Sequence, residues 1–216
     1  MMEHLLSFFL TVRFKDSIQS FDEGMEAYKK GNYSTALNIW TPLAQQGDSN
    51  AQNGLGLISL KGEGFLQNDE VALQWFRLAA EQGHRNAQVA LGIIYNYGQA
   101  VPRNDEVAEK WYTVAAEQGN ALAQVALGGI YVGEDGWGVP QDYKSAFKFY
   151  KTSAEHGDER GQVSLGLLYL DGLGVHPNDE IAGEWFRLAA EQGDPDGQFF
   201  LGMMYCKGLG FPESSS

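Results

Sequence analysis

The sequence AEQG at residues 80–83 decides the fold, because it returns several times along the chain. It recurs unchanged at residues 116–119 and 190–193, as AEHG at 154–157 and as AQQG at 44–47. The closing glycines are therefore 36, 36, 38 and 36 residues apart, at Gly47, Gly83, Gly119, Gly157 and Gly193. A period in the mid-thirties is typical of solenoids built from pairs of helices, so we predict an all-α repeat protein.

Each unit contains two helical phrases separated by a glycine-rich loop. The first phrase places Ala87, Leu91 and Tyr95, and their counterparts in other units, on one helix face at spacings of four residues. A glycine such as Gly92 recurs in its middle, where it costs about 1 kcal/mol relative to alanine. We therefore expect the backbone of a second helix to lie close to it. The second phrase is expected to begin at an aspartate N-cap, namely Asp69, Asp105, Asp142 or Asp179.

These residues resemble the Sel1-like repeat, a relative of the tetratricopeptide repeat. The shared pattern is A-Q-x-x-L-G-x-x-Y, a glycine loop, then A-x-x-W-[FY]-x-x-A-A-E-Q-G, and it covers residues 51–212. Ser59 stands in place of the tyrosine, Ala100 replaces a loop glycine, and two residues are inserted near Glu134. The resemblance implies a right-handed α-α superhelix of stacked antiparallel helix pairs. It also implies an adaptor or scaffold role, in bacteria often linked to the envelope or to host interaction.

The repeats predict the domain organisation. A capping or signal-like segment comes first, followed by a tetratricopeptide-like unit with helices near 17–30 and 33–46. Four Sel1-like units and a C-terminal half unit come next. The predicted boundaries are 1–16, 17–50, 51–86, 87–122, 123–160, 161–196 and 197–216.

Composition narrows the partners and the compartment. The formal net charge of −13 disfavours nucleic acid and anionic lipid, which require a basic face, and is compatible with basic protein partners. No run approaches the roughly 18 to 20 apolar residues of a membrane span. Residues 5–12 read LLSFFLTV, but no basic residue precedes them and no cleavage pattern follows. This weak signal favours the cytoplasm over the periplasm or secretion.

The sequence predicts no catalytic, cofactor or metal site. Cys206 is the single cysteine, which excludes an intrachain disulfide and a thiolate cluster, and the four histidines lack ligand spacing. The glycine loops lack the Lys-Ser/Thr of a phosphate loop, and the Asp-Glu pairs stand at helix starts, where capping explains them. One enzymatic alternative comes from cysteine-rich Sel1-like proteins described as penicillin-binding or β-lactamase-like hydrolases. Those relatives carry a Cys pair in each repeat, which this chain does not.

A partner-binding groove is expected along the first helices of the units, on the face that Ala, Leu and Tyr leave unused. Four rows of equivalent positions lie there. The third of these helices carries glycine in two rows in place of larger residues, at Gly129 and Gly133. The predicted groove for a protein or peptide is formed by Asn53, Leu57, Leu60, Val89, Ile93, Asn96, Tyr97, Val125, Val132, Val163, Leu167, Leu170, Phe199 and Met203. The alternative is that superhelical twist buries some of them between neighbours.

The last unit has a first helix and a glycine loop but no second helix before Ser216. Phe199, Phe200, Met203 and Met204 therefore lack the helix that follows in other units. Two hypotheses account for this: the chain is part of a longer array, or its open helix associates with a second copy or another partner.

Overall fold

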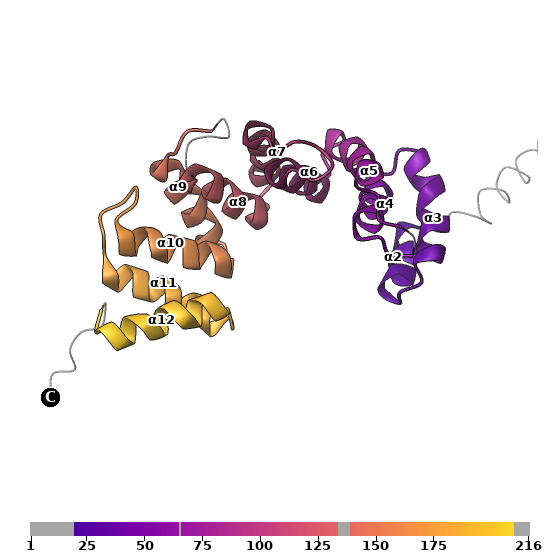
Figure 1. Cartoon of the computed structure of the whole chain (residues 1–216). Helices are drawn as coiled ribbons and strands as arrows, with labels where there is room; N and C mark the ends of the chain where they lie inside the picture. The colour runs from indigo at the N-terminus through magenta and orange to yellow at the C-terminus, as the bar shows by residue number, and fades with distance from the viewer. Residues whose placement is uncertain (1–19, 65, 134–138, 210–216) are drawn as a thin grey trace, which may run out of the picture. The chain divides into compact units, whose positions relative to one another are not determined.

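The computed structural model describes residues 20–64, 66–133 and 139–209. Every regular element in these ranges is an α-helix, and successive helices pack against one another as antiparallel pairs (Figure 1). The predicted all-α solenoid is therefore confirmed. The chain divides into two compact units, one up to Ala87 and one from Gln88 onward, and each is described separately below. The predicted segment 1–16 lies outside the described residues.

The first unit is organised around one indole ring. Trp40 is 1% exposed, stacks on Phe21 with ring centroids 5.4 Å apart, and donates a hydrogen bond to the Phe21 carbonyl. Its ring also touches Gly24 and Gly54, so it joins three helices. The unit comprises α2 (Phe21–Lys29), α3 (Tyr33–Gln45), α4 (Ser49–Lys61) and α5 (Asp69–Glu81). The helices expected near 17–30 and 33–46 are confirmed as α2, which begins after its N-cap Ser20, and α3.

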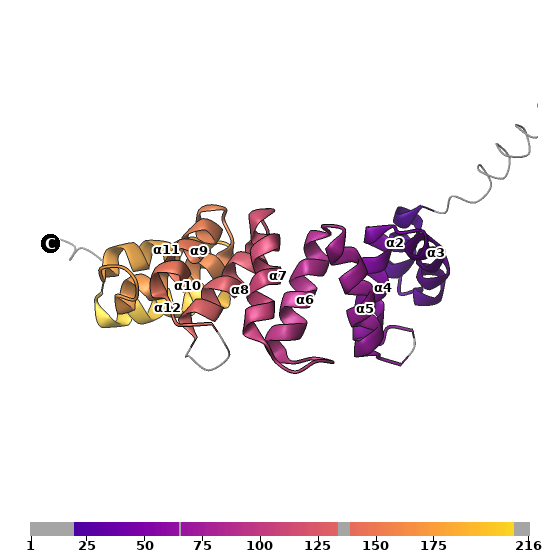
Figure 2. The same cartoon turned by 90° about the horizontal axis from the view of Figure 1, so that it is seen from above.

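The second unit begins within α6 and continues as three and a half helix pairs. Figures 1 and 2 show α8 to α12 following one another, each against its predecessor. Its core consists of small alanines and large rings, such as Ala108 with Tyr112 and Ala182 with Phe186. Its helices are α6 (Arg85–Tyr97), α7 (Asp105–Glu117), α8 (Ala121–Val132), α9 (Tyr143–Glu155), α10 (Glu159–Asp171), α11 (Asp179–Glu191) and α12 (Pro195–Lys207).

The N-caps of the second helices correct the sequence-based expectation. The cap is Asp142 in α9, as predicted, but Asn68, Asn104 and Asn178 cap α5, α7 and α11, because their side chains accept the N3 amide. The aspartates that follow occupy the first helical position. They are left free to interact with the helix dipole or, as at Asp105, to form other contacts.

The mid-helix glycines accommodate aromatic rings. The expectation that a helix backbone lies there is wrong: a Cβ on Gly56 or Gly166 would stand 2.6 Å from the ring of Phe76 or Phe186. Tyr112 covers Gly92 in the same way. The first helices α4, α6, α8 and α10 therefore each receive a ring from the second helix of their own repeat, and a larger residue would exclude that ring.

A hydrogen bond between two glutamine side chains joins the two helices of most repeats. The Gln82 amide, at the C-cap of α5, donates to Gln52 Oε1 on α4 at 2.7 Å. The same bond joins Gln118 to Gln88 at 2.7 Å and Gln192 to Gln162 at 2.9 Å. The unit of α8 and α9 differs: its C-cap is His156, whose Nδ1 lies 2.7 Å from the Thr152 carbonyl. Within the part of the chain that the structure describes, buried Gln124 Oε1 has no hydrogen-bond partner.

Replacing His156→Gln is expected to stabilise the second unit by about 1 kcal/mol, because it gives a buried, unpaired acceptor a donor. The midpoint of urea unfolding, followed by circular dichroism, measures this. The converse change, Gln192→His, removes the donor to Gln162 and should destabilise by a similar amount. If the two substitutions shift the midpoint in the same direction, the glutamine pair does not stabilise the helix pair.

His84 gives the first unit a pH dependence. Its Nδ1 accepts a hydrogen bond from the Ala87 backbone amide at 3.2 Å. It has the same capping role at the start of α6 that the Asp48 carboxylate has at the start of α4. Burial lowers the pKa of His84, because the imidazolium is desolvated there. The folded protein therefore binds fewer protons at His84 than the unfolded chain. The resulting stability is complete above the unfolded pKa, about 6.5, and is lost as the pH falls below it.

We expect the unfolding midpoint of the wild type to fall more between about pH 7 and about pH 5 than that of His84→Asn. Asparagine caps α8 at the equivalent Asn120, so the variant keeps the cap and loses the titration. Paired urea titrations at both pH values measure the difference. An identical pH dependence in both proteins would contradict the assignment to His84.

Candidate functional site

A hollow of about 550 Å³ lies within the second unit, between α6, α7 and α8. Its lining combines apolar residues, mostly from α8, with polar residues from the end of α6 to the start of α7. Its size is within the range of sites that hold small ligands or peptide side chains. The residues that line it are Ile93, Asn96, Tyr97, Arg103, Asp105, Tyr112, Leu122, Val125, Ala126, Gly129, Ile130, Gly133 and Val139.

Gly129 on α8 keeps this hollow open. Gly129 occupies the position that holds a large apolar residue in the other first helices: Leu57, Ile93, Leu167 and Met203. A Cβ on Gly129 would meet only Tyr150 Oη, at 3.8 Å. Unlike Gly128, which is covered by the Tyr150 ring, Gly129 is exposed and receives no packing partner. The helix therefore carries a glycine here that the packing of α8 on α9 does not require.

The polar end of the hollow is built around a buried carboxylate. Asp105 is 6% exposed and accepts two hydrogen bonds from Arg103, from Nε at 3.0 Å and Nη2 at 2.7 Å. The amide of Asn96 donates to the same carboxylate at 3.0 Å. The bond to Asp105 also raises the pKa of the Arg103 guanidinium further. Because the two charges neutralise each other, the wall carries little net charge.

Two polar atoms at this hollow have no partner among the described residues. A carboxylate only accepts, so the Asn96 amide must present its nitrogen to Asp105, which leaves Asn96 Oδ1 as an unpaired acceptor. Tyr112 is 1% exposed, and within the described ranges its hydroxyl makes no hydrogen bond. Burial raises the pKa of Tyr112, so the phenol stays protonated and able to donate. The hollow therefore offers one acceptor and one donor beside an apolar end.

The structure brings four of the predicted groove residues together. Ile93, Asn96 and Tyr97 of α6 and Val125 of α8 all line the hollow, and Tyr97 is 72% exposed. Sequence reasoning missed Arg103, Asp105 and Tyr112, which come from the loop after α6 and from α7. The glycine at 129, in a row otherwise filled by large apolar residues, was the signal in the sequence that could have located the site.

The other predicted groove residues lie elsewhere. Asn53, Val89 and Val163 are buried, as the alternative of burial between neighbouring helices anticipated for some of them. The half-buried ones lie on α4, α8, α10 and α12: Leu57, Leu60, Val132, Leu167, Leu170 and Met203. Phe199 is 65% exposed on α12. Their part in binding stays a prediction.

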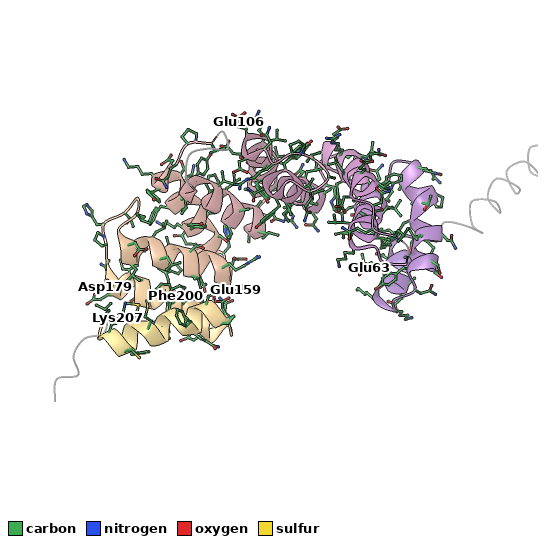
Figure 3. The ribbon with its side chains drawn as sticks, in the orientation of Figure 1. Glu63, Glu106, Glu159, Asp179, Phe200 and Lys207 are labelled. Carbon is green, nitrogen blue, oxygen red and sulfur yellow. The ribbon has the colours of Figure 1, made fainter. Side chains whose placement is uncertain are left out.

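The outer face of α12 is uncovered among the described residues. A Cβ on Gly202 would meet nothing within 4 Å, whereas a ring covers the equivalent glycine of the four preceding first helices. Tyr205 is exposed, as is Cys206. Phe200, labelled in Figure 3 at the junction of α11 and α12, stacks on Phe186 at 5.2 Å, so it belongs to the core. Met204 is fully buried as well, so both residues pack into the core although no second helix follows α12 among the described residues.

Neither a metal-ligand cluster nor a membrane-spanning helix is present in the described ranges. No group of three or more His, Cys, Asp or Glu side chains there could hold a metal ion. Among the helices of those ranges, none combines the length and apolar character needed to cross a bilayer.

Comparison with known families identifies the repeats. The family described as Sel1 repeat matches residues 49–84, 85–120, 121–158, 160–194 and 195–215. These five matches cover most of the chain. No curated protein matches the sequence significantly.

Solved structures agree with this result. A Sel1 repeat protein from Oxalobacter formigenes is 38% identical over 89% of this chain and 79% of its own, with a TM-score of 0.80. The protective antigen c5321 of uropathogenic Escherichia coli, which has the same repeat fold, is 34% identical with a TM-score of 0.79. That match covers 87% of this chain but 41% of the antigen. A third structure, from Klebsiella pneumoniae, is 21% identical with a TM-score of 0.56 and supports the fold alone.

Proposed function

Because this chain belongs to the Sel1 repeat family, whose repeats generally act as non-enzymatic modules for protein–protein interaction, we propose that it binds a segment of another protein in the hollow between α6 and α8. The binding residues would include Ile93, Asn96, Tyr97 and Val125. The remaining predicted groove residues would extend the contact along the first helices. The predicted repeat boundaries are compatible with this proposal, because two successive repeats, 87–122 and 123–160, contribute the residues that line the hollow.

The observation that carries the proposal is the single exposed glycine on α8, Gly129. Gly129 lacks the side chain that would fill the hollow, although glycine destabilises a helix interior by about 1 kcal/mol. A protein keeps such a cost where another group needs the space. The exposed Tyr97 at the rim provides a large amphipathic surface of the kind that dominates protein interfaces.

Site-specific photo-crosslinking in the cells that produce the protein tests the proposal. The variant Tyr97→p-benzoylphenylalanine places a crosslinker at the rim of the hollow, and Lys110→p-benzoylphenylalanine places one on an exposed position of α7 outside the lining. We expect one discrete adduct from position 97 that position 110 does not give. The adduct should disappear when Gly129→Leu is added and persist with Gly129→Ala. Equal adducts from both positions, or none from position 97, would reject the hollow as the binding site.

The uncovered face of α12 favours a second candidate, in which two copies of the chain associate through this helix. Gly202 is equivalent to the glycines that an aromatic ring covers in the preceding first helices, but no described residue covers it. Light scattering at high protein concentration should then give twice the 23.8 kDa mass, and Gly202→Leu should restore the monomer. A monomer mass for the unmodified chain would reject self-association.

A further inference from the structure

The hollow between α6 and α8 has a composition that restricts which peptide group can occupy it, and the following inference rests on the proposed function above. The apolar part of its lining includes the α8 residues Leu122, Val125, Ala126 and Ile130, together with Gly129. A peptide group that enters the hollow contacts these aliphatic side chains and loses its contact with water. Burial of apolar area is the main favourable contribution to binding at such a surface, so a charged or strongly polar tip is excluded.

The repeat itself indicates the size of the missing group. At the position of Gly129, the other first helices carry two leucines, an isoleucine and a methionine: Leu57, Leu167, Ile93 and Met203. A leucine, isoleucine or methionine side chain from outside would fill the same volume against the same kind of neighbours. The hollow is larger than one such side chain, so it also has room for the peptide backbone that carries it.

The polar end fits a peptide group. Asn96 Oδ1 can accept a hydrogen bond and the Tyr112 hydroxyl can donate one, and neither is paired among the described residues. A backbone amide supplies one donor and one acceptor, which matches this pair. The Arg103–Asp105 ion pair next to them is internally neutralised, so it does not call for a charged ligand.

The negative charge around the hollow affects which peptide segments are attracted to it. The chain carries a formal net charge of −13, and exposed carboxylates such as Glu106, labelled in Figure 3, lie on α7, which contributes Asp105 and Tyr112 to the lining. A partner segment with lysine or arginine beside the inserted residue is therefore attracted, and an acidic segment is repelled.

We infer that the hollow between α6 and α8 is a specificity pocket for a single aliphatic side chain of leucine, isoleucine or methionine, presented by a basic peptide segment whose backbone amide binds Asn96 and Tyr112. The partner supplies the side chain that α8 lacks at Gly129. Gly129→Leu would fill the pocket from within and act as an internal competitor. Gly129→Ala would remove the glycine and leave most of the space open.

A displayed library of random peptides, selected on the full chain, provides the probe. Selected peptides are then synthesised, and their dissociation constants are measured for the wild type, Gly129→Ala and Gly129→Leu. We expect enrichment of one aliphatic position with basic neighbours, and replacement of that residue by alanine should abolish binding. Gly129→Leu should weaken binding about tenfold or more, while Gly129→Ala changes it little. Asn96→Leu should weaken binding without changing the preferred side chain.

The outcomes separate the two proposals. Peptides that lose binding to Gly129→Leu but share an aromatic or acidic residue would keep the hollow as a peptide site and overturn the aliphatic specificity. Peptides that bind all three proteins equally, or a selection that enriches nothing, would overturn both. Binding that is insensitive to salt would overturn the basic character of the segment. Circular dichroism of each variant establishes that it is folded.

Discussion

Gly128→Ala should destabilise the second unit by about 2 kcal/mol or more, whereas Gly129→Ala, one residue away, should stabilise it by up to about 1 kcal/mol. A Cβ on Gly128 would overlap the ring of Tyr150, which is buried between α8 and α9. A Cβ on Gly129 faces open space, with its nearest atom 3.8 Å away. Both substitutions gain the same helix propensity, so the difference between them isolates the packing term.

The measurement is the urea midpoint of the two variants, followed by circular dichroism. Gly128→Ala combined with Tyr150→Leu provides a control, because a smaller side chain on α9 should recover part of the lost stability. Similar midpoints for the two alanine variants would mean that the Tyr150 ring moves away at little cost. That result would contradict the close packing on which the distinction between the two glycines depends.

Trp40→Ala should destabilise the first unit by about 3 to 5 kcal/mol. The side chain is almost fully buried, packs on Gly24 and Gly54, and stacks on Phe21. Alanine would leave a cavity between α2, α3 and α4 that their backbones cannot close without moving. Because repeat units depend mainly on their neighbours, the loss should be greatest in these three helices.

Hydrogen exchange read by mass spectrometry locates this effect. Amide protection should fall in α2 to α4 and be retained in α10 and α11. Trp40→Phe keeps most of the ring and removes the hydrogen bond to the Phe21 carbonyl, so it should cost less than Trp40→Ala. Equal loss of protection in both regions would indicate that the chain unfolds as one cooperative body.

The candidate site was predictable in part. The repeat register places Ile93, Tyr97 and Val125 on the same face of successive first helices, since helical periodicity is contained in the sequence. Asp105 was interpreted as an N-cap, because an aspartate at a helix start suits that role. The structure instead gives the cap to Asn104 and turns Asp105 toward Arg103 and Asn96. Only the fold of the loop before α7 decides between these roles, because both residues have capping side chains.

The sequence by itself determined the repeat period, the pairing of helices and the position of the glycines, because these are local patterns that recur at fixed spacing. It did not determine what lies against each glycine. The repeat marks Gly129 as the exception in its row, but it does not show that Gly128 is covered by Tyr150 and that Gly129 is open. The tertiary structure decided this, because the environment of a helical residue depends on which side chains the next helix brings to its face. The hollow, its buried carboxylate and its unpaired hydroxyl follow from that packing.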